Sequence, residues 1–150
     1  MRFMFDTMIF AHIVADPSFA DAVRDATSSG SITILTTHIQ EDQIAAIGDD
    51  EKREAIMRIP RTVVPTTGIA IGVSKLGIAR TADEDTSATI ERIGQRHLKN
   101  TMDALIAASA RDEADVIVTD DKTLRKRMLR EGLHVPMLTF EEFRRHVSTL

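Results

Sequence analysis

The sequence of 150 residues contains no cysteine, tryptophan or tyrosine, and no long apolar run. Without cysteine the chain has no disulfides and no thiolate metal sites, so it needs no oxidising compartment. No segment approaches the roughly 18 apolar residues of a membrane span. Asp6 and His12 interrupt the apolar start of the chain, and no small-residue cleavage site follows it. We therefore expect a cytoplasmic protein.

The chain also lacks an excess of positive charge, since 19 lysine and arginine residues face 23 acids and give a net charge of -4. This sign weighs against a module that binds nucleic acid through general electrostatics alone. It leaves room for an enzyme whose acids are neutralised by divalent cations. The length suits one domain, 1-150, with a core of ordinary size.

Short β-branched or apolar runs alternate with helical patterns along the whole chain. The alternation predicts an α/β fold of three layers, α/β/α, around a central, mainly parallel sheet. The expected strands are Arg2 to Phe5, Ile32 to Leu35, Thr62 to Val64, Val116 to Val118 and Val135 to Leu138.

Several helix starts carry recognisable capping residues. Asp16 precedes Pro17, which suits the first position of a helix. Capping boxes are expected where Thr37 and Thr139 each precede a Gln or Glu by three residues. Asn100 is expected to cap a long helix, which would place Asp103 in its first turn.

Two segments in the middle of the chain give weaker patterns. Residues 69-76 fit either a helix weakened by Gly72 or a loop. Residues 81-86 contain Asp83, Glu84 and Asp85, which we interpret as a solvated loop before a helix at 87-97.

Four acids are expected at one edge of the sheet. Asp6 and Asp121 follow strands, while Glu41 and Asp103 fall in first turns of helices that begin at the same side. Each acid alone also fits a helix cap or a favourable dipole interaction. Together, with no obvious basic partner in these motifs, they would repel one another and raise each other's pKa. Carboxylate oxygens of this kind suit Mg²⁺ or Mn²⁺.

The motifs FDTMIF, TTHIQEDQI, NTMDALIAASA and VIVTDDKTL together resemble the four acidic motifs of PIN-domain ribonucleases. This is the fold of the toxins in VapBC toxin-antitoxin pairs, and the similarity runs from Phe3 to the strand at Val135. Two departures stand out: Met8 occupies a position where the family usually has Asn, and residues 69-85 have no clear counterpart in its pattern.

The resemblance implies a metal-dependent endoribonuclease that hydrolyses RNA phosphodiester bonds, as the toxin of a type II toxin-antitoxin pair. It carries the roles of metal ligand and catalytic acid to Asp6, Glu41, Asp103 and Asp121, with Asp120 as an extra or substitute ligand. The implied cofactor is Mg²⁺ or Mn²⁺, and the implied partners are an RNA substrate, an antitoxin protein and a second copy in a homodimer.

Some neighbouring residues have two interpretations. Thr7 or Thr119 would orient a ligand or a water molecule from just outside the metal site. Lys122, Arg125 and Lys126 share a face of a predicted helix, which is either simply solvated or in contact with the RNA backbone.

Two other classes of function remain to be separated from the nuclease. A receiver-type phosphoacceptor domain also gathers acids at the carboxyl edge of a parallel sheet. It needs an acceptor Asp after a middle strand, and here the third strand ends in Val64, Pro65 and Thr66. A PIN-like domain that binds RNA or protein without catalysis would not need to keep four acids, although Met8 leaves that class open.

Overall fold

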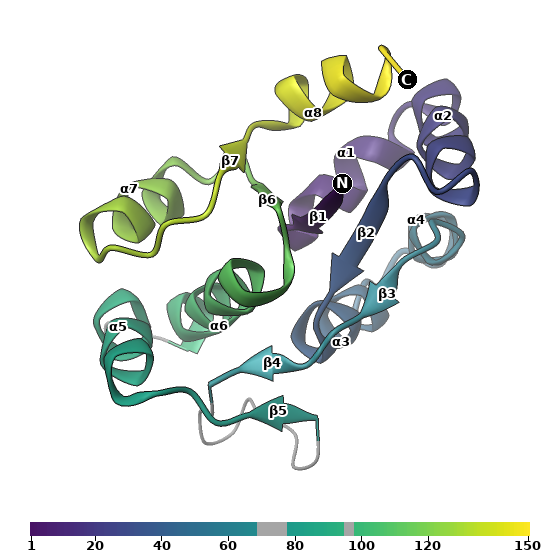
Figure 1. Ribbon diagram of the computed structural model, residues 1–150. Coiled ribbons are helices and arrows are strands. Elements are labelled where there is room, and N and C mark those ends of the chain that lie inside the picture. The colour runs from purple at the N-terminus through teal and green to yellow at the C-terminus, as the bar shows by residue number, and fades with distance from the viewer. Residues whose placement is uncertain (69–77, 95–97) are drawn as a thin grey trace.

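The computed structural model describes residues 1–68, 78–94 and 98–150 (Figure 1). Its main sheet is built from strands β1 (Arg2–Phe5), β2 (Thr33–Thr36), β3 (Thr62–Val63), β6 (Val116–Val118) and β7 (Met137–Leu138). The helices are α1 (Thr7–Val14), α2 (Pro17–Ser28), α3 (His38–Ala45), α4 (Asp50–Met57), α5 (Glu84–Gly94), α6 (Leu98–Glu113), α7 (Lys122–Arg130) and α8 (Phe140–Val147).

All neighbouring strands of the main sheet run parallel, in the order β3-β2-β1-β6-β7. The central strand β1 therefore lies between β2 and β6, with Phe3 opposite Ile34 on one side and Val116 on the other. Pro136 precedes the edge strand β7, where its missing N–H is tolerated. The mainly parallel sheet predicted from the sequence is confirmed.

Alternating residues of each strand feed two separate cores, one on each face of the sheet. Phe3 and Phe5 of β1 pack with α1, α2 and α8, and the ring of Phe143 lies 5.2 and 4.9 Å from their rings, edge to face. Met4, between them, points to the opposite face and packs with α5, α6 and α7. The helices thus cover both faces (Figure 1), which gives the predicted three-layer α/β/α arrangement.

The capping patterns predict most helix starts correctly. The Asp16 side chain accepts a hydrogen bond from Phe19 N at the start of α2. Thr37 and Thr139 form capping boxes at α3 and α8. After α7 the chain turns at Gly132 with φ of 72°, a backbone conformation that favours glycine.

Two helix starts differ from the prediction. Helix α6 begins at Leu98, so Asp103 lies in the second turn and Asn100 is inside the helix. Leu98 and Lys99 are both good helix formers and extend the helix towards its N-terminus. Helix α5 begins at Glu84 because Asp83 caps it, accepting a hydrogen bond of 2.7 Å from Thr86 N.

A small second sheet was not expected from the sequence. Strands β4 (Thr66–Thr67) and β5 (Ala79–Arg80) pair in parallel beside α6, where Thr67 N donates to the Ser109 hydroxyl. The ambiguous segment at 69-76 lies outside the described residues. Among the helices that the structure describes, none combines the length and the apolar content needed to cross a membrane.

Candidate functional site

The ends of β1 and β6 bring two of the predicted acids together. Phe5 pairs with Val118 in the parallel register, and Asp6 N donates a hydrogen bond of 2.9 Å to Val118 O. The chain then leaves β1 at Asp6 and β6 at Thr119, on the same edge of the sheet. Asp6 and Asp121 meet at this point because both follow strands that are direct neighbours.

A buried hydroxyl connects the two acids. Thr119 is fully buried, and its Oγ1 donates to Asp6 Oδ2 over 2.9 Å. The same oxygen accepts a hydrogen bond of 3.1 Å from Asp121 N. Thr119 therefore fixes the Asp6 carboxylate relative to the backbone of Asp121, which is the orienting role expected for one of the two threonines.

Asp121 also caps helix α7. Its Oδ1 accepts hydrogen bonds of 2.8 Å from Thr123 N and 2.9 Å from Leu124 N. Within the described part of the chain, no hydrogen bond reaches its second oxygen, Oδ2. One oxygen is thus used by the fold, and the other is available to a ligand.

The electrostatics of Asp6 differ from those of an ordinary surface acid. Burial raises the pKa of Asp6 above its usual value, and the charge of Asp121 raises it further. The hydrogen bonds from Thr119 and from the backbone at Met8 and Thr7 lower the pKa only in part. Among the residues that the structure describes, no lysine, arginine or histidine forms an ion pair with Asp6 or Asp121, so these two carboxylates have no basic partner there.

Asp120 points to a different part of the molecule from its neighbour Asp121. Its Oδ1 accepts from Phe140 N at the start of α8 over 2.9 Å, and its Oδ2 lies 3.4 Å from His12 Nδ1. These contacts join β6 to α8 and α1. Of the two adjacent acids, Asp121 is the one whose charge acts on Asp6.

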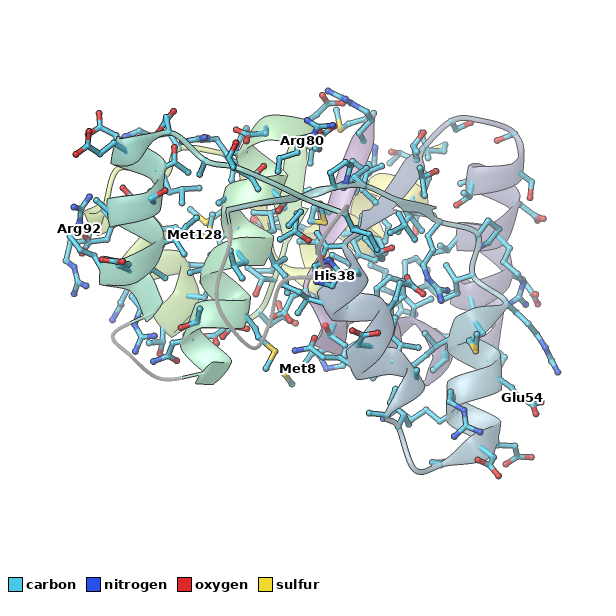
Figure 2. All side chains as sticks on the ribbon, turned by 90° about the horizontal axis from the view of Figure 1, so that it is seen from below. Met8, His38, Glu54, Arg80, Arg92 and Met128 are labelled. Carbon is cyan, nitrogen blue, oxygen red and sulfur yellow. The ribbon has the colours of Figure 1, made fainter. Side chains whose placement is uncertain are left out.

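Asp103 lies in the second turn of α6, directly after Met102. The hydroxyl of Thr7, next to Asp6, donates to Gln43 Oε1, and Gln43 Nε2 lies 3.6 Å from Met102 Sδ. This chain of side chains leads from Asp6 to the residue that precedes Asp103. Met8, on the same side, is 62% exposed and lies at the molecular surface (Figure 2).

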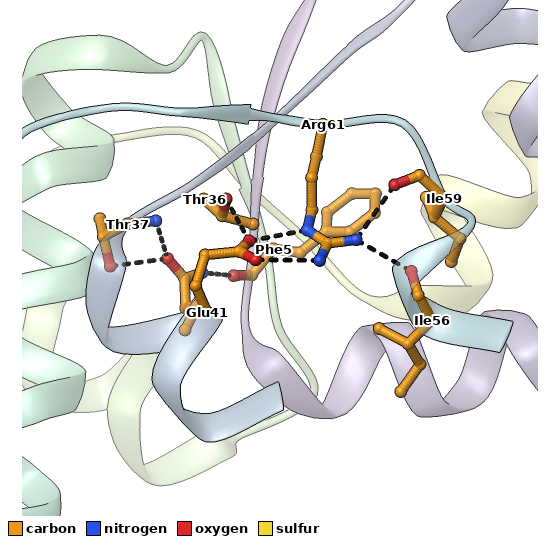
Figure 3. Close-up of polar contacts among 8 residues, drawn as sticks. Phe5, Thr36, Thr37, Glu41, Ile56, Ile59 and Arg61 are labelled. Carbon is orange, nitrogen blue, oxygen red and sulfur yellow. Dashed lines mark hydrogen bonds and ion pairs between the residues drawn. The ribbon is translucent and has the colours of Figure 1, made fainter. Parts of the chain in front are cut away.

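Glu41 has a basic partner that the sequence motifs did not reveal. Arg61 donates from Nε to Glu41 Oε1 over 2.7 Å and from Nη2 to Oε2 over 2.9 Å (Figure 3). The Thr36 hydroxyl donates to Oε1 over 2.8 Å. Burial raises the pKa of Glu41, but the hydrogen bonds from Arg61 and Thr36 outweigh it, and the net pKa is lowered.

Arg61 is itself held in place by the surrounding fold. Its side chain is only 8% exposed, and its Nη1 donates to Ile56 O over 2.9 Å and to Ile59 O over 3.1 Å. The guanidinium lies 5.6 Å from the centre of the Phe10 ring. Glu41 and Arg61 together therefore tie α3 to the segment between α4 and β3.

The pairing of β2 and β3 explains why sequence reasoning missed Arg61. Thr62 pairs with Leu35, near the carboxyl end of β2, so the residue just before β3 lies close to the start of α3. The signal in the sequence was an arginine immediately before a predicted strand. Only the offset between the two strands brings it to Glu41.

His38 and Gln40 serve the fold around the start of α3. His38 is buried, and its Nδ1 lies 2.8 Å from the Thr66 hydroxyl, in keeping with a first-turn residue (Figure 2). Gln40 Oε1 accepts from Thr37 N over 2.6 Å, and Gln40 Nε2 donates to Phe5 O. These bonds connect α3 to the ends of both β2 and β1.

The residues at this edge fit a divalent cation to different degrees. Asp6 and Asp121 offer carboxylate oxygens with no cation beside them, which is the donor chemistry that Mg²⁺ and Mn²⁺ take. Both oxygens of Glu41 are bonded to Arg61. Across residues 1–68, 78–94 and 98–150, no three His, Asp or Glu side chains are grouped to hold a metal ion. The structure thus brings two predicted ligands together and holds Glu41 in an ion pair.

Comparisons with known proteins do not assign a family. No protein-family model matches the chain, and no curated protein matches it. One similar solved structure is the crystal structure of VapBC2 from Rickettsia felis bound to a DNA fragment from its promoter. The two share 13% identity and a TM-score of 0.48, with 93% of this chain and 98% of that chain covered. This likeness is too low to carry an argument about activity or partners.

Proposed function

We propose that the protein is a metal-dependent endoribonuclease whose site is centred on Asp6 and Asp121. The observation that supports it best is the carboxylate pair at the carboxyl edge of β1 and β6, joined by Thr119 and lacking a cation. A like-charge pair that is partly buried costs stability unless something compensates it. A bound divalent cation supplies that compensation.

The aspartates and Thr119 have different roles in the proposed site. Asp6 and Asp121 would hold Mg²⁺ or Mn²⁺ through their carboxylate oxygens, and Asp103, which follows Met102 on α6, would be the third ligand. The metal, when bound, lowers the pKa of a water molecule and stabilises negative charge on the phosphate. Thr119 keeps Asp6 turned towards Asp121. Asp120 serves the contact with α8, so Asp121 is the ligand of the two.

Glu41 can act as a metal ligand only if its hydrogen bonds to Arg61 break. Its two hydrogen bonds to the guanidinium are well formed, and Arg61 is buried. As it stands, Glu41 therefore stabilises the start of α3 beside the site. In this scheme Asp6 and Asp121 would hold the metal, with Asp103 as the proposed third ligand.

The second candidate is a PIN-like domain that binds RNA or protein without cleaving RNA. The engagement of Glu41 by Arg61 favours this alternative, because one of the four expected acids is neutralised within the chain. Under either candidate, the resemblance of the acidic motifs makes an antitoxin and a homodimer the partners to look for.

The test is cleavage of labelled RNA by the wild-type protein with Mn²⁺, with EDTA, and by Asp6→Asn and Asp103→Asn in Mn²⁺. Asp21→Asn is the matched control, because Asp21 is an exposed acid on α2 that pairs with Arg24. We expect cleavage by the wild type and the control with Mn²⁺ only, and a loss of about 100-fold or more in the two site variants. Unchanged cleavage by Asp6→Asn, or no cleavage by a folded wild-type protein, would reject the nuclease.

A further inference from the structure

Helix α7 is strongly basic in a chain of negative net charge. Its nine residues, KTLRKRMLR, include five lysines and arginines and no acid, whereas the whole chain has a net charge of -4. Leu124 and Met128 are buried, so they anchor the helix to the sheet. The basic residues lie on the remaining surface of the helix.

Part of this charge forms a regular row. Lys122, Lys126 and Arg130 are exposed and follow one another at intervals of four residues, so they are neighbours on one face with Cβ atoms about 5–6 Å apart. Lys122 directly follows Asp121 in the chain. The row therefore begins beside the carboxylate pair and leads away from it along about two turns of helix.

The row is less neutralised than other basic positions of the molecule. Elsewhere, Arg24, Arg53 and Arg80 are each paired with an acid, namely Asp21, Asp50 and Glu113. In the part of the chain that the structure describes, no hydrogen bond or ion pair engages the side chains of Lys122 and Lys126. These two ammonium groups are free for an external anion.

At the far end of the helix, one acid is shared by two cations. Glu131 Oε1 accepts from Arg130 over 2.7 Å, and its Oε2 accepts from Arg92 of α5 over 2.9 Å (Figure 2 labels Arg92). This cluster keeps a net positive charge. Leu129, 58% exposed, adds an apolar side chain between Arg125 and Lys126 on the helix surface.

We infer that the row Lys122, Lys126 and Arg130 binds the phosphate backbone of the RNA strand that enters the Asp6 and Asp121 site. This inference rests on the proposed function, because it is the phosphodiester chemistry of that site that favours RNA over an acidic protein. A net charge of -4 repels a polyanion in general. A positive row that starts at the site gives the strand one favourable direction of approach.

The experiment measures binding of a fluorescently labelled single-stranded RNA in EDTA, where cleavage is not required, over a range of KCl concentrations. The variant is Lys122→Gln with Lys126→Gln, since both positions are exposed and glutamine is also a good helix former. The matched control is Lys52→Gln with Arg58→Gln. Lys52 lies in α4 and Arg58 is the residue that caps its C-terminus, so the control removes the same charge from another helix.

We expect the α7 variant to bind about tenfold or more weakly at low salt, with the slope of log K against log salt reduced by about 1.4. The control keeps the wild-type slope. Equal losses in the variant and the control, or no RNA binding by the wild type, would overturn the inference. The inference would also be overturned if binding of a labelled poly-glutamate peptide depended on the two lysines and binding of RNA did not.

Failure of this inference is separable from failure of the proposed function. Cleavage of RNA in Mn²⁺ by both the wild type and the α7 variant, with identical KM values, would leave the nuclease intact and remove the role of α7. Binding that depends on α7, with no cleavage under any condition, would support the RNA surface and reject the nuclease.

Discussion

Asp6 directly follows β1 and Glu41 lies in the first turn of the helix after the neighbouring strand β2, yet the structure shifts their pKa values in opposite directions. Asp6 lies beside a second acid, and burial together with Asp121 raises its pKa. Glu41 is held by Arg61 and Thr36, and its pKa is lowered. The folded protein therefore favours the ionised form of Glu41. It disfavours the ionised form of Asp6, which a bound cation would stabilise. The difference separates a structural ion pair from a candidate ligand site.

Of the variants that change these two sites, we expect Arg61→Met to have the largest effect on the free energy of unfolding. Removing the buried guanidinium leaves Glu41 without its counterion and frees two backbone carbonyls, at Ile56 and Ile59. We expect the free energy of unfolding to fall by about 3–5 kcal/mol. Urea denaturation followed by circular dichroism measures it.

The control is Arg58→Met, at an exposed arginine that lies 3.7 Å from Glu54. We expect a change there within about 1 kcal/mol. Similar losses in both variants would mean that the Arg61 contacts do not stabilise the fold more than a surface ion pair.

A smaller effect is expected for Glu41→Gln, because Arg61 keeps its bonds to the backbone. At pH 7 the loss should be about 1.5–3 kcal/mol, the range for hydrogen bonds to a charged group. The folded pKa of Glu41 lies below its ordinary value of 4.5, so the stabilisation is present above that value. It disappears as the pH falls through the lower, folded pKa.

Stability curves of the wild type and Glu41→Gln should therefore converge in acid, separate as the pH rises from the folded pKa to 4.5, and keep a constant difference above 4.5. Guanidinium denaturation at a series of pH values measures the difference. A constant difference at all pH values would show that the charge of Glu41 contributes nothing.

The smallest effect, with the opposite sign, is expected for Asp6→Asn. The folded pKa of Asp6 lies above its ordinary value of 3.8, so ionisation costs stability as the pH rises towards the folded pKa. Without divalent metal, the asparagine variant should be more stable than the wild type at pH 7, by less than the roughly 2 kcal/mol expected for Glu41→Gln. The gain should vanish in acid.

Adding Mn²⁺ sharpens the same comparison. A ligand that binds only the folded state raises its stability by about 2.7 kcal/mol at a hundred times its Kd. We expect Mn²⁺ to raise the melting temperature of the wild type and of Glu41→Gln, but not that of Asp6→Asn. An equal rise in all three would place the metal elsewhere.

Local sequence patterns were sufficient for most of the fold. The apolar run Arg2 to Phe5 marked a strand, and Thr37 and Thr139 marked helix starts through short-range hydrogen bonds. These features depend on residues within one turn or one strand. For that reason they can be recognised without knowing the rest of the structure.

The candidate site was only partly predictable. A parallel sheet places the ends of its strands at one edge, which was enough to bring Asp6 and Asp121 together. The start of α6 was placed three residues late, since Asn100 suits a cap but is also accommodated inside a helix. The small sheet of β4 and β5 has strands of two residues, too short to give a periodic pattern.

The sequence by itself determined the order of the main-sheet strands and helices along the chain, the parallel sheet and the edge at which Asp6 and Asp121 lie. Only the tertiary structure decided which charges are compensated. Arg61 reaches Glu41 because β3 is offset along β2, whereas none of the residues that the structure describes forms an ion pair with Asp6. Electrostatic pairing depends on distances between segments far apart in the chain, and those distances are set by packing and strand register rather than by local pattern.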